Sequence, residues 1–261
     1  MALTFDQYIA NPLGKRNAVM SSITRESIRA NYTNRFNNIL LRENGIINYY
    51  TYKSSTNDYI IHIKIPSELV KKFYYDVVIR FYTDSKVADL GRNLSKYYFQ
   101  VYSNDPAFVY THAYVFLKNN LFFKDLQSKM SPKALKQVPK VTNPTKELAY
   151  VKSIYFAYLF MTNRNLFKTA AWSNAEPYVA SKLINNIMPA EDKIRLRQEE
   201  GAKISKRKQI VIDKNTAKKL HKLNLSDGAK ESLVVTTDKV PTIKKTKAIN
   251  SSRKSRVLKK K

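Results

Sequence analysis

The chain contains no cysteine, which excludes disulfide bonds and thiolate metal sites. Glycine is also scarce, with five in 261 residues. A phosphate-binding loop needs clustered glycines, whereas Gly14, Gly45 and Gly91 lie far apart and are the only glycines before residue 200. We therefore expect no nucleotide-binding loop and no cofactor.

Acidic residues and long apolar runs are missing as well. Lys and Arg number 47 against 20 Asp and Glu, a formal net charge of +27. No apolar run approaches the roughly 20 residues of a membrane-spanning helix, and the first residues lack the basic-then-apolar pattern of a secretory signal. We expect no membrane span and a soluble, cytoplasm-like compartment. The charge excess favours a polyanionic partner such as DNA, RNA, an anionic membrane or an acidic protein.

Aromatic residues are confined to the first part of the chain, because the last one is Tyr178. Residues 191–261 carry 22 Lys and Arg against 8 Asp and Glu, about three times the net charge density of the preceding residues. A segment without aromatic rings can hardly build a core of its own. The sequence therefore predicts an aromatic-rich α+β body over 1–178, a connecting helical segment over 179–200 and a basic extended arm over 201–261.

The hydrophobic periodicity of the body predicts an α+β fold. It has an N-terminal helix, an antiparallel sheet of about four strands, C-terminal helices and then the extended basic tail. The expected elements are a helix over 22–44, a hairpin over 46–65 with its turn at 54–58, strands over 73–84 and 97–103, and helices over 106–119, 131–137, 145–163, 176–188 and 190–208.

Local signals support several of these elements. Gly45 follows the first helix and is free to adopt positive φ. Asp105 can cap a helix that begins at Pro106. The helix over 145–163 is apolar nearly all round in its second half, which predicts a central position or an interface. Its expected apolar stripe comprises Leu148, Val151, Tyr155, Tyr158, Leu159 and Thr162.

Few residue patterns indicate catalysis. His62, His112 and His221 include no pair with the i, i+4 spacing of a zinc-binding helix, and we interpret them as structural or solvated. A metal-dependent nuclease would set carboxylates beside a lysine at strand ends. The candidates for such a site are Glu68, Asp76, Asp84 and Lys86. Acidic residues at strand ends are more often turn formers, so a nuclease is the less favoured alternative.

Tyrosines are frequent on the expected strands. They are Tyr49, Tyr50, Tyr52, Tyr59, Tyr74, Tyr75 and Tyr82. Bases could stack on such rings, but tyrosine is also favoured in strands and in protein interfaces. We favour an interface in an assembly over base stacking.

The C-terminal cations are the candidate binding residues. Phosphate contacts need only Lys and Arg, and without aromatic rings they suit a duplex backbone or another polyanion without base specificity. As a flexible coil, the last 71 residues would span roughly 45 Å. The candidates are Lys206, Arg207, Lys208, Lys244, Lys245, Lys247, Arg253, Lys254, Arg256, Lys259, Lys260 and Lys261.

Three stretches carry a resemblance to a known class of proteins: "IHIKIPSELVKKFYYDVVIRFYT", "YSNDPAFVYTHAYVFLKN" and "YVKSIYFAYLF". Together they resemble virion structural proteins of tailed bacteriophages from hosts of low G+C content. The likeness covers about residues 10–165 and carries no catalytic motif. It implies a capsid, neck or tail component, with a head–tail connector as the favoured role, made in the host cytoplasm and present in the virion.

Three functions follow as hypotheses. The first is a non-enzymatic structural protein of a phage particle. It would assemble as a homo-oligomeric ring or shell with other virion proteins, and its basic arm would contact double-stranded DNA or a neighbouring subunit. The second is a non-specific double-stranded DNA-binding protein in replication or packaging. The third, less favoured, is a metal-dependent nuclease that uses Asp76 and Asp84.

Overall fold

A five-stranded sheet in the order β4-β3-β2-β1-β5 forms the centre of the fold. The structure is a computed structural model, and it describes residues 3–10, 25–83, 93–136, 138–139, 148, 150–203 and 205. All of these belong to one structural unit, Met1–Ile210. The α+β class expected from the sequence is confirmed.

Four strands follow one another in antiparallel pairs, as predicted. They are β1 (Tyr49–Lys53), β2 (Tyr59–Pro66), β3 (Tyr74–Tyr82) and β4 (Tyr98–Ser103). In the turn between β1 and β2, Ser54 Oγ accepts a hydrogen bond from the Asp58 N–H at 3.1 Å, and Asn57 adopts φ 61°. The predicted hairpin at 54–58 is therefore confirmed, and its turn is held by a side chain-to-backbone bond.

The sheet also contains a strand that the sequence did not predict. β5 (Glu176–Pro177) pairs in parallel with Tyr52 and Lys53 of β1. The sheet is therefore mixed rather than purely antiparallel. The stretch beginning at Glu176 was expected to be helical, but the helix α6 begins only at Ala180, because the preceding residues are extended beside β1.

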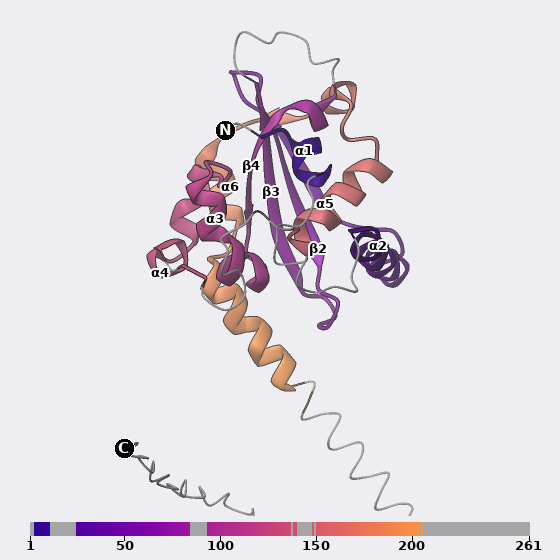
Figure 1. The fold of residues 1–261 in the computed structure, drawn as a ribbon, viewed down its shortest axis with the longest axis vertical. Coiled ribbons are helices and arrows are strands. Elements are labelled where there is room, and N and C mark those ends of the chain that lie inside the picture. The colour runs from indigo at the N-terminus through magenta and orange to yellow at the C-terminus, as the bar shows by residue number, and fades with distance from the viewer. Residues whose placement is uncertain are drawn as a thin grey trace, which may run out of the picture. The chain divides into compact units, whose positions relative to one another are not determined.

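Helices lie on both sides of the sheet (Figure 1). One group comprises α1 (Phe5–Ala10), α2 (Arg25–Arg42) and α5 (Lys152–Asn163). The other comprises α3 (Ala113–Lys118), α4 (Pro132–Lys136) and α6 (Ala180–Asn186). Short 3₁₀ turns occur at Leu94–Lys96, Lys124–Lys129 and Thr169–Trp172.

This arrangement buries both faces of the central strands. On β3, Val77, Ile79 and Phe81 are fully buried on one face, and Val78 is fully buried on the other. From the strand tyrosines we expected an interface in an assembly to cover such side chains. Within the described chain, the protein's own helices provide that cover.

The long helices follow their sequence signals with one correction. α2 buries Phe36 and Ile39, and Gly45 follows it at φ 72° as predicted. α5 begins at Lys152 instead of near residue 145, because Val151 is extended. Its buried face therefore differs from the predicted stripe, and Thr162 is exposed. The buried residues of α5 are Ser153, Ile154, Tyr155, Phe156, Ala157, Phe160 and Met161.

Two further helical segments follow Asp105 and Pro189. Asp105 Oδ1 accepts a hydrogen bond from the Ala107 N–H at 3.0 Å, so the predicted cap is confirmed. The segment continues as a π-helical turn, Phe108–His112, into α3. The other segment is helical over residues 190–203 and buries Ala190 and Ile194. It passes the predicted start of the basic arm at residue 201.

Candidate functional site

The twelve C-terminal cations selected from the sequence lie outside the described residues. So do Asp84 and Lys86 of the nuclease alternative, Gly14 and His221. Among the described residues, no three His, Cys, Asp or Glu side chains approach one another as metal ligands would. No helix in the described ranges is long and apolar enough to cross a membrane.

Asp76 belongs to a buried polar network. His62 Nε2 lies 2.8 Å from Asp76 Oδ1, and Asn104 Nδ2 donates to Asp76 Oδ2 at 2.7 Å. Asn104 Oδ1 in turn accepts a hydrogen bond from the Asp76 N–H at 2.8 Å. Both carboxylate oxygens of Asp76 are therefore occupied by protein partners, and Glu68 is bonded elsewhere.

The strand tyrosines divide between core and surface. Tyr52 and Tyr75 are buried, whereas Tyr49 and Tyr50 are 39% and 42% exposed. Tyr49 contacts the ring of Phe160 on α5. Most of the aromatic rings on β1, β2 and β3 are therefore at least partly used inside the fold rather than displayed together.

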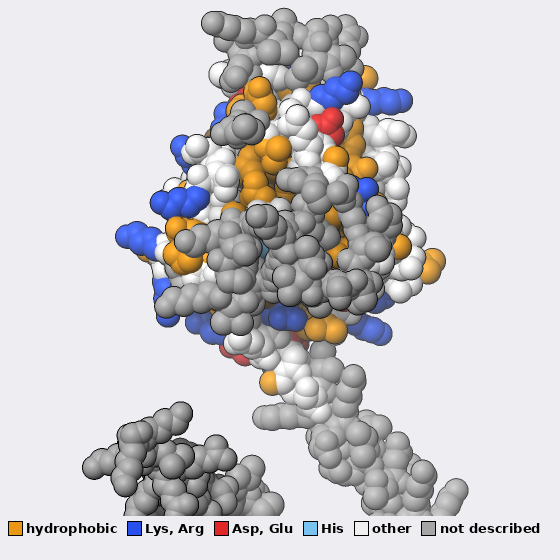
Figure 2. All heavy atoms as spheres, in the orientation of Figure 1, with side chains coloured by type: hydrophobic (Ala, Val, Ile, Leu, Met, Phe, Trp, Pro, Cys, Tyr) orange, Lys and Arg blue, Asp and Glu red, His pale blue; other side chains and the backbone are white. Residues whose placement is uncertain are grey.

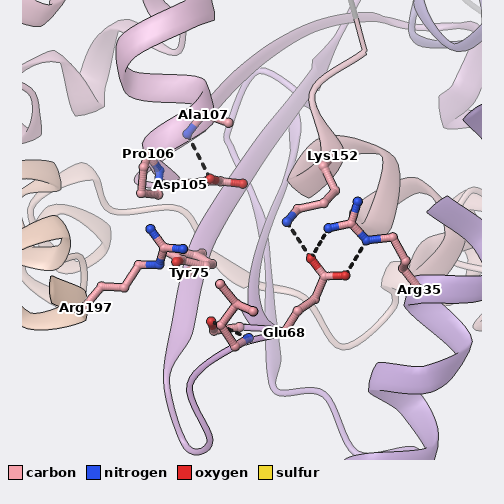
Figure 3. A pocket seen from close by; sticks show the side chains of 10 residues that line it. Arg35, Glu68, Tyr75, Asp105, Pro106, Ala107, Lys152 and Arg197 are labelled. Atoms are coloured by element: carbon pink, nitrogen blue, oxygen red, sulfur yellow. Dashed lines mark hydrogen bonds and ion pairs between the residues drawn. The ribbon is translucent and has the colours of Figure 1, made fainter. Parts of the chain in front are cut away.

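Several charged side chains of the described chain line a pocket of about 320 Å³. Its walls come from α2, the β2–β3 loop, β3, the start of the segment after β4, the first residue of α5 and the helix over 190–203 (Figure 3). It is lined by Arg35, Ser67, Glu68, Leu69, Tyr75, Asp105, Pro106, Ala107, Lys152 and Arg197. Three cations and two carboxylates thus face one small volume.

Glu68 joins two of these cations. Arg35 donates from Nε and Nη2 to the two carboxylate oxygens at 2.5 and 2.6 Å, and Lys152 Nζ lies 2.6 Å from Oε2. Burial alone would raise the pKa of Glu68, but the hydrogen bonds from Arg35 and Lys152 outweigh it and hold the pKa below its ordinary value. The loop is further fixed by Arg42, which donates to the Ser67 and Glu68 carbonyl oxygens. Glu68 is therefore ionised near neutral pH, and it is held by Arg35 and Lys152 at its carboxylate and by Arg42 at its backbone.

Asp105 presents a different arrangement. One carboxylate oxygen caps the helical segment, but Oδ2 is buried without a hydrogen-bond partner among the described residues. The residue is 5% exposed. In Figure 3 its carboxylate points across the pocket toward the side of Lys152. An anionic oxygen is thus left unpaired in a pocket that three cations line.

Tyr75 and Arg197 complete the pocket. Burial raises the pKa of Tyr75 to about 12, although the neighbouring Ser67 and Arg197 side chains act in the opposite direction. Within the described chain, Arg197 has no carboxylate at ion-pair distance. The pocket thus contains one cation and one carboxylate oxygen that do not neutralise each other.

Sequence reasoning did not find this pocket. Glu68 lies 33 residues from Arg35 and 84 residues from Lys152. No periodic pattern or spacing rule relates residues that far apart. Two of its residues did carry a sequence signal. Asp105 was predicted as a helix cap, and Glu68 was a candidate of the nuclease alternative, but neither signal indicated the partners found here.

Comparison with known proteins adds no relative. No protein-family model matches the chain. No curated protein matches it. No solved structure matches its fold.

Proposed function

We propose that this protein is a non-enzymatic structural protein of a phage particle. Its folded body associates with further copies, and its C-terminal segment contacts the backbone of double-stranded DNA. The observation that carries the proposal is where the charge imbalance begins. Residues 206–261 hold 18 Lys and Arg against 4 Asp and Glu, and the described fold ends immediately before them.

The last described helix differs sharply from the segment that follows it. Over residues 190–203 there are four cations and four carboxylates. Two ion pairs lie along this helix, Arg195 with Asp192 and Lys203 with Glu200. The net excess of positive charge thus begins after the helix, in a segment without aromatic rings. Such a segment suits phosphate contacts that carry no base information.

The visible face of the body has the same sign. In the face shown in Figure 2, Lys and Arg side chains lie around the rim and few Asp or Glu side chains are visible. This surface would raise the local concentration of a polyanion. It supports a role beside DNA, and the proposal places that role in the virion, after synthesis in the host cytoplasm.

Self-association is assigned to the segment between α2 and β1. Leu41 and Ile46 are 77% and 67% exposed, and the half-exposed Tyr49 and Tyr50 follow them. β1 pairs with β2 along its whole length, but on its other side only Tyr52 and Lys53 pair with a strand, β5, in the described chain. An open strand edge beside exposed apolar side chains is a template for pairing with another copy.

DNA binding is tested with the full-length chain and a duplex of arbitrary sequence over a range of salt concentrations. Neutralising nine cations in residues 241–261 by Lys→Gln and Arg→Gln should weaken binding and reduce its salt dependence. A control neutralises exposed body lysines, Lys71, Lys124, Lys133 and Lys136. Equal binding by the arm variant and the parent would rule out the arm as a DNA contact.

Self-association is tested by sedimentation at several protein concentrations. Leu41→Ser together with Ile46→Ser should shift the chain toward the monomer. The matched control is Leu69→Ser, because Leu69 is 73% exposed on a different loop. If the parent is monomeric at all concentrations, the assembly role is rejected.

The alternatives make different predictions. A replication or packaging protein would bind duplex DNA but be absent from purified virions in mass spectrometry. A nuclease would cleave DNA with Mg²⁺ or Mn²⁺ and lose that activity on Asp84→Ala. Asp76→Ala is the less useful variant for this test, because both oxygens of Asp76 already have protein partners.

A further inference from the structure

We propose that the pocket between α2, α5 and the helix over 190–203 binds a phosphate group that retains a proton. The ligand is inorganic phosphate or the terminal phosphate of a small monoester. This inference is independent of DNA binding by the C-terminal segment, because a backbone phosphodiester carries no such proton.

Hydrogen-bond donors are in surplus in the pocket. A guanidinium has five N–H donors and an ammonium has three. Arg35 uses two donors on Glu68, and Lys152 uses one. Arg197 has no carboxylate partner in the described chain. The pocket therefore suits a ligand with several acceptor oxygens, which favours a tetrahedral oxyanion over a neutral molecule.

Asp105 adds the opposite requirement. Its Oδ2 is buried and has no donor among the described residues, although three cations line the same pocket. A cluster that served stability alone would pair this oxygen with Lys152 or Arg197, since an unpaired buried charge is costly. Asp105 and the three cations instead line one pocket, and a ligand O–H group that reached Oδ2 would satisfy this oxygen.

A phosphate that retains a proton meets both requirements at once. Its ionised oxygens accept from Lys152 and Arg197, and its O–H donates to Asp105. Sulfate has the same shape but no proton at neutral pH, so it would place a negative oxygen against the Asp105 carboxylate. The pocket volume of about 320 Å³ is at the small end of ligand sites, as a phosphate or small monoester requires.

The surrounding backbone supports the same ligand. Lys152 is the first residue of α5, a twelve-residue helix without a side-chain cap at its start. The positive end of the helix dipole therefore lies at the pocket wall and favours an anion there. Glu68 holds Lys152 and Arg35 in place, so the donors are positioned before a ligand arrives.

The first experiment needs no variant. Isothermal titration of the full-length protein is carried out at low ionic strength and near neutral pH, with inorganic phosphate and with sulfate. We expect phosphate to bind about tenfold more tightly, because sulfate leaves the Asp105 oxygen opposed by a like charge. The basic segment does not produce this preference, because sulfate is at least as highly charged. Equal or tighter binding of sulfate would overturn the proposal.

Esters identify the source of the phosphate. Methyl phosphate keeps a proton near neutral pH, whereas dimethyl phosphate does not. Binding of methyl phosphate together with inorganic phosphate indicates a terminal phosphate, and binding of inorganic phosphate alone indicates the free ion. Dimethyl phosphate binding as well as inorganic phosphate would contradict the role of Asp105.

Two variants locate the site. Arg197→Gln should weaken phosphate binding about tenfold, whereas Arg195→Gln on the same helix removes the same charge outside the pocket and should have little effect. Asp105→Asn keeps a side-chain oxygen to cap Ala107 and should reduce the preference for phosphate over sulfate. If Arg195→Gln and Arg197→Gln weaken binding equally, the ion is attracted by net charge and the pocket is not its site.

Discussion

His62 on β2 and Asp76 on β3 form a hydrogen bond of 2.8 Å inside the protein, on the same face of the sheet. His62 is fully buried and Asp76 is 5% exposed. Asp76 also accepts from Asn104, which follows β4. The Asp76 carboxylate therefore connects β3 to β2 and to the residue that follows β4. Its removal would leave the buried side chains of His62 and Asn104 without this partner.

Asp76→Ala should strongly destabilise the fold. Breaking a buried hydrogen-bonded pair by removing one partner costs about 3–5 kcal/mol. Urea unfolding followed by the fluorescence of Trp172, the one tryptophan, measures the change. Asp192→Ala is the control, because its exposed pair with Arg195 should contribute about 1 kcal/mol or less. Similar losses for the two variants would show that the buried network adds little.

The same carboxylate makes stability depend on acid. Burial alone would raise the pKa of Asp76, but the hydrogen bond and charge of His62, with smaller contributions from Lys193 and Asn104, hold the pKa below its ordinary 3.8. A lowered pKa stabilises the folded state above the ordinary value, and this contribution is lost as pH falls through the folded value. The free energy of unfolding should therefore fall below about pH 3.8. Asp76→Asn should flatten that part of the profile, and an unchanged slope would contradict the assignment.

The salt bridge between Glu68 and Arg35 should contribute less to the free energy of unfolding than the buried network around Asp76. The Arg35 side chain is 40% exposed, so solvent screens the pair. A double-mutant cycle with Glu68→Gln and Arg35→Gln should give a coupling of about 1 kcal/mol. The more exposed pair Glu200 and Lys203 provides the comparison and should couple by only a few tenths of a kcal/mol. A larger coupling for the surface pair would contradict this ranking.

The sequence predicts those strands and helices whose residue pattern repeats within the element itself. The alternation in β2 and β3 and the helical spacing in α2 are repeated over several residues, so each strand or helix is visible by itself. β5 is two residues long, and only its contact with Tyr52 and Lys53 makes it a strand. α5 was placed too early because its composition is helical before Lys152, whereas Val151 is extended in the fold. The pocket depends on long-range contacts such as Lys152 with Glu68, which no local pattern contains.

The two glycines within the described ranges should respond to alanine in opposite directions. Gly45 adopts φ 72° with open space around it, so Gly45→Ala meets no atom and pays only for the left-handed backbone, about 1–2 kcal/mol. Gly201 is helical and also has no atom near the added carbon. Gly201→Ala should therefore stabilise by up to about 1 kcal/mol. The two changes in unfolding free energy are measured under identical conditions, and equal signs would contradict the backbone argument.

Tyr75 should make the fold sensitive to alkali. Burial raises the pKa of Tyr75 to about 12 from an ordinary value of 10.0. The folded state therefore holds this proton more tightly than the unfolded state does. Its contribution to stability is complete below pH 10.0 and is lost as pH rises toward about 12. Burial also raises the pKa of Tyr8 and Tyr102. Tyr75→Phe removes one such group and should make the loss of stability in this range less steep. Urea unfolding of the parent and of Tyr75→Phe at several pH values above 10.0 measures the two slopes, and equal slopes would contradict the assignment.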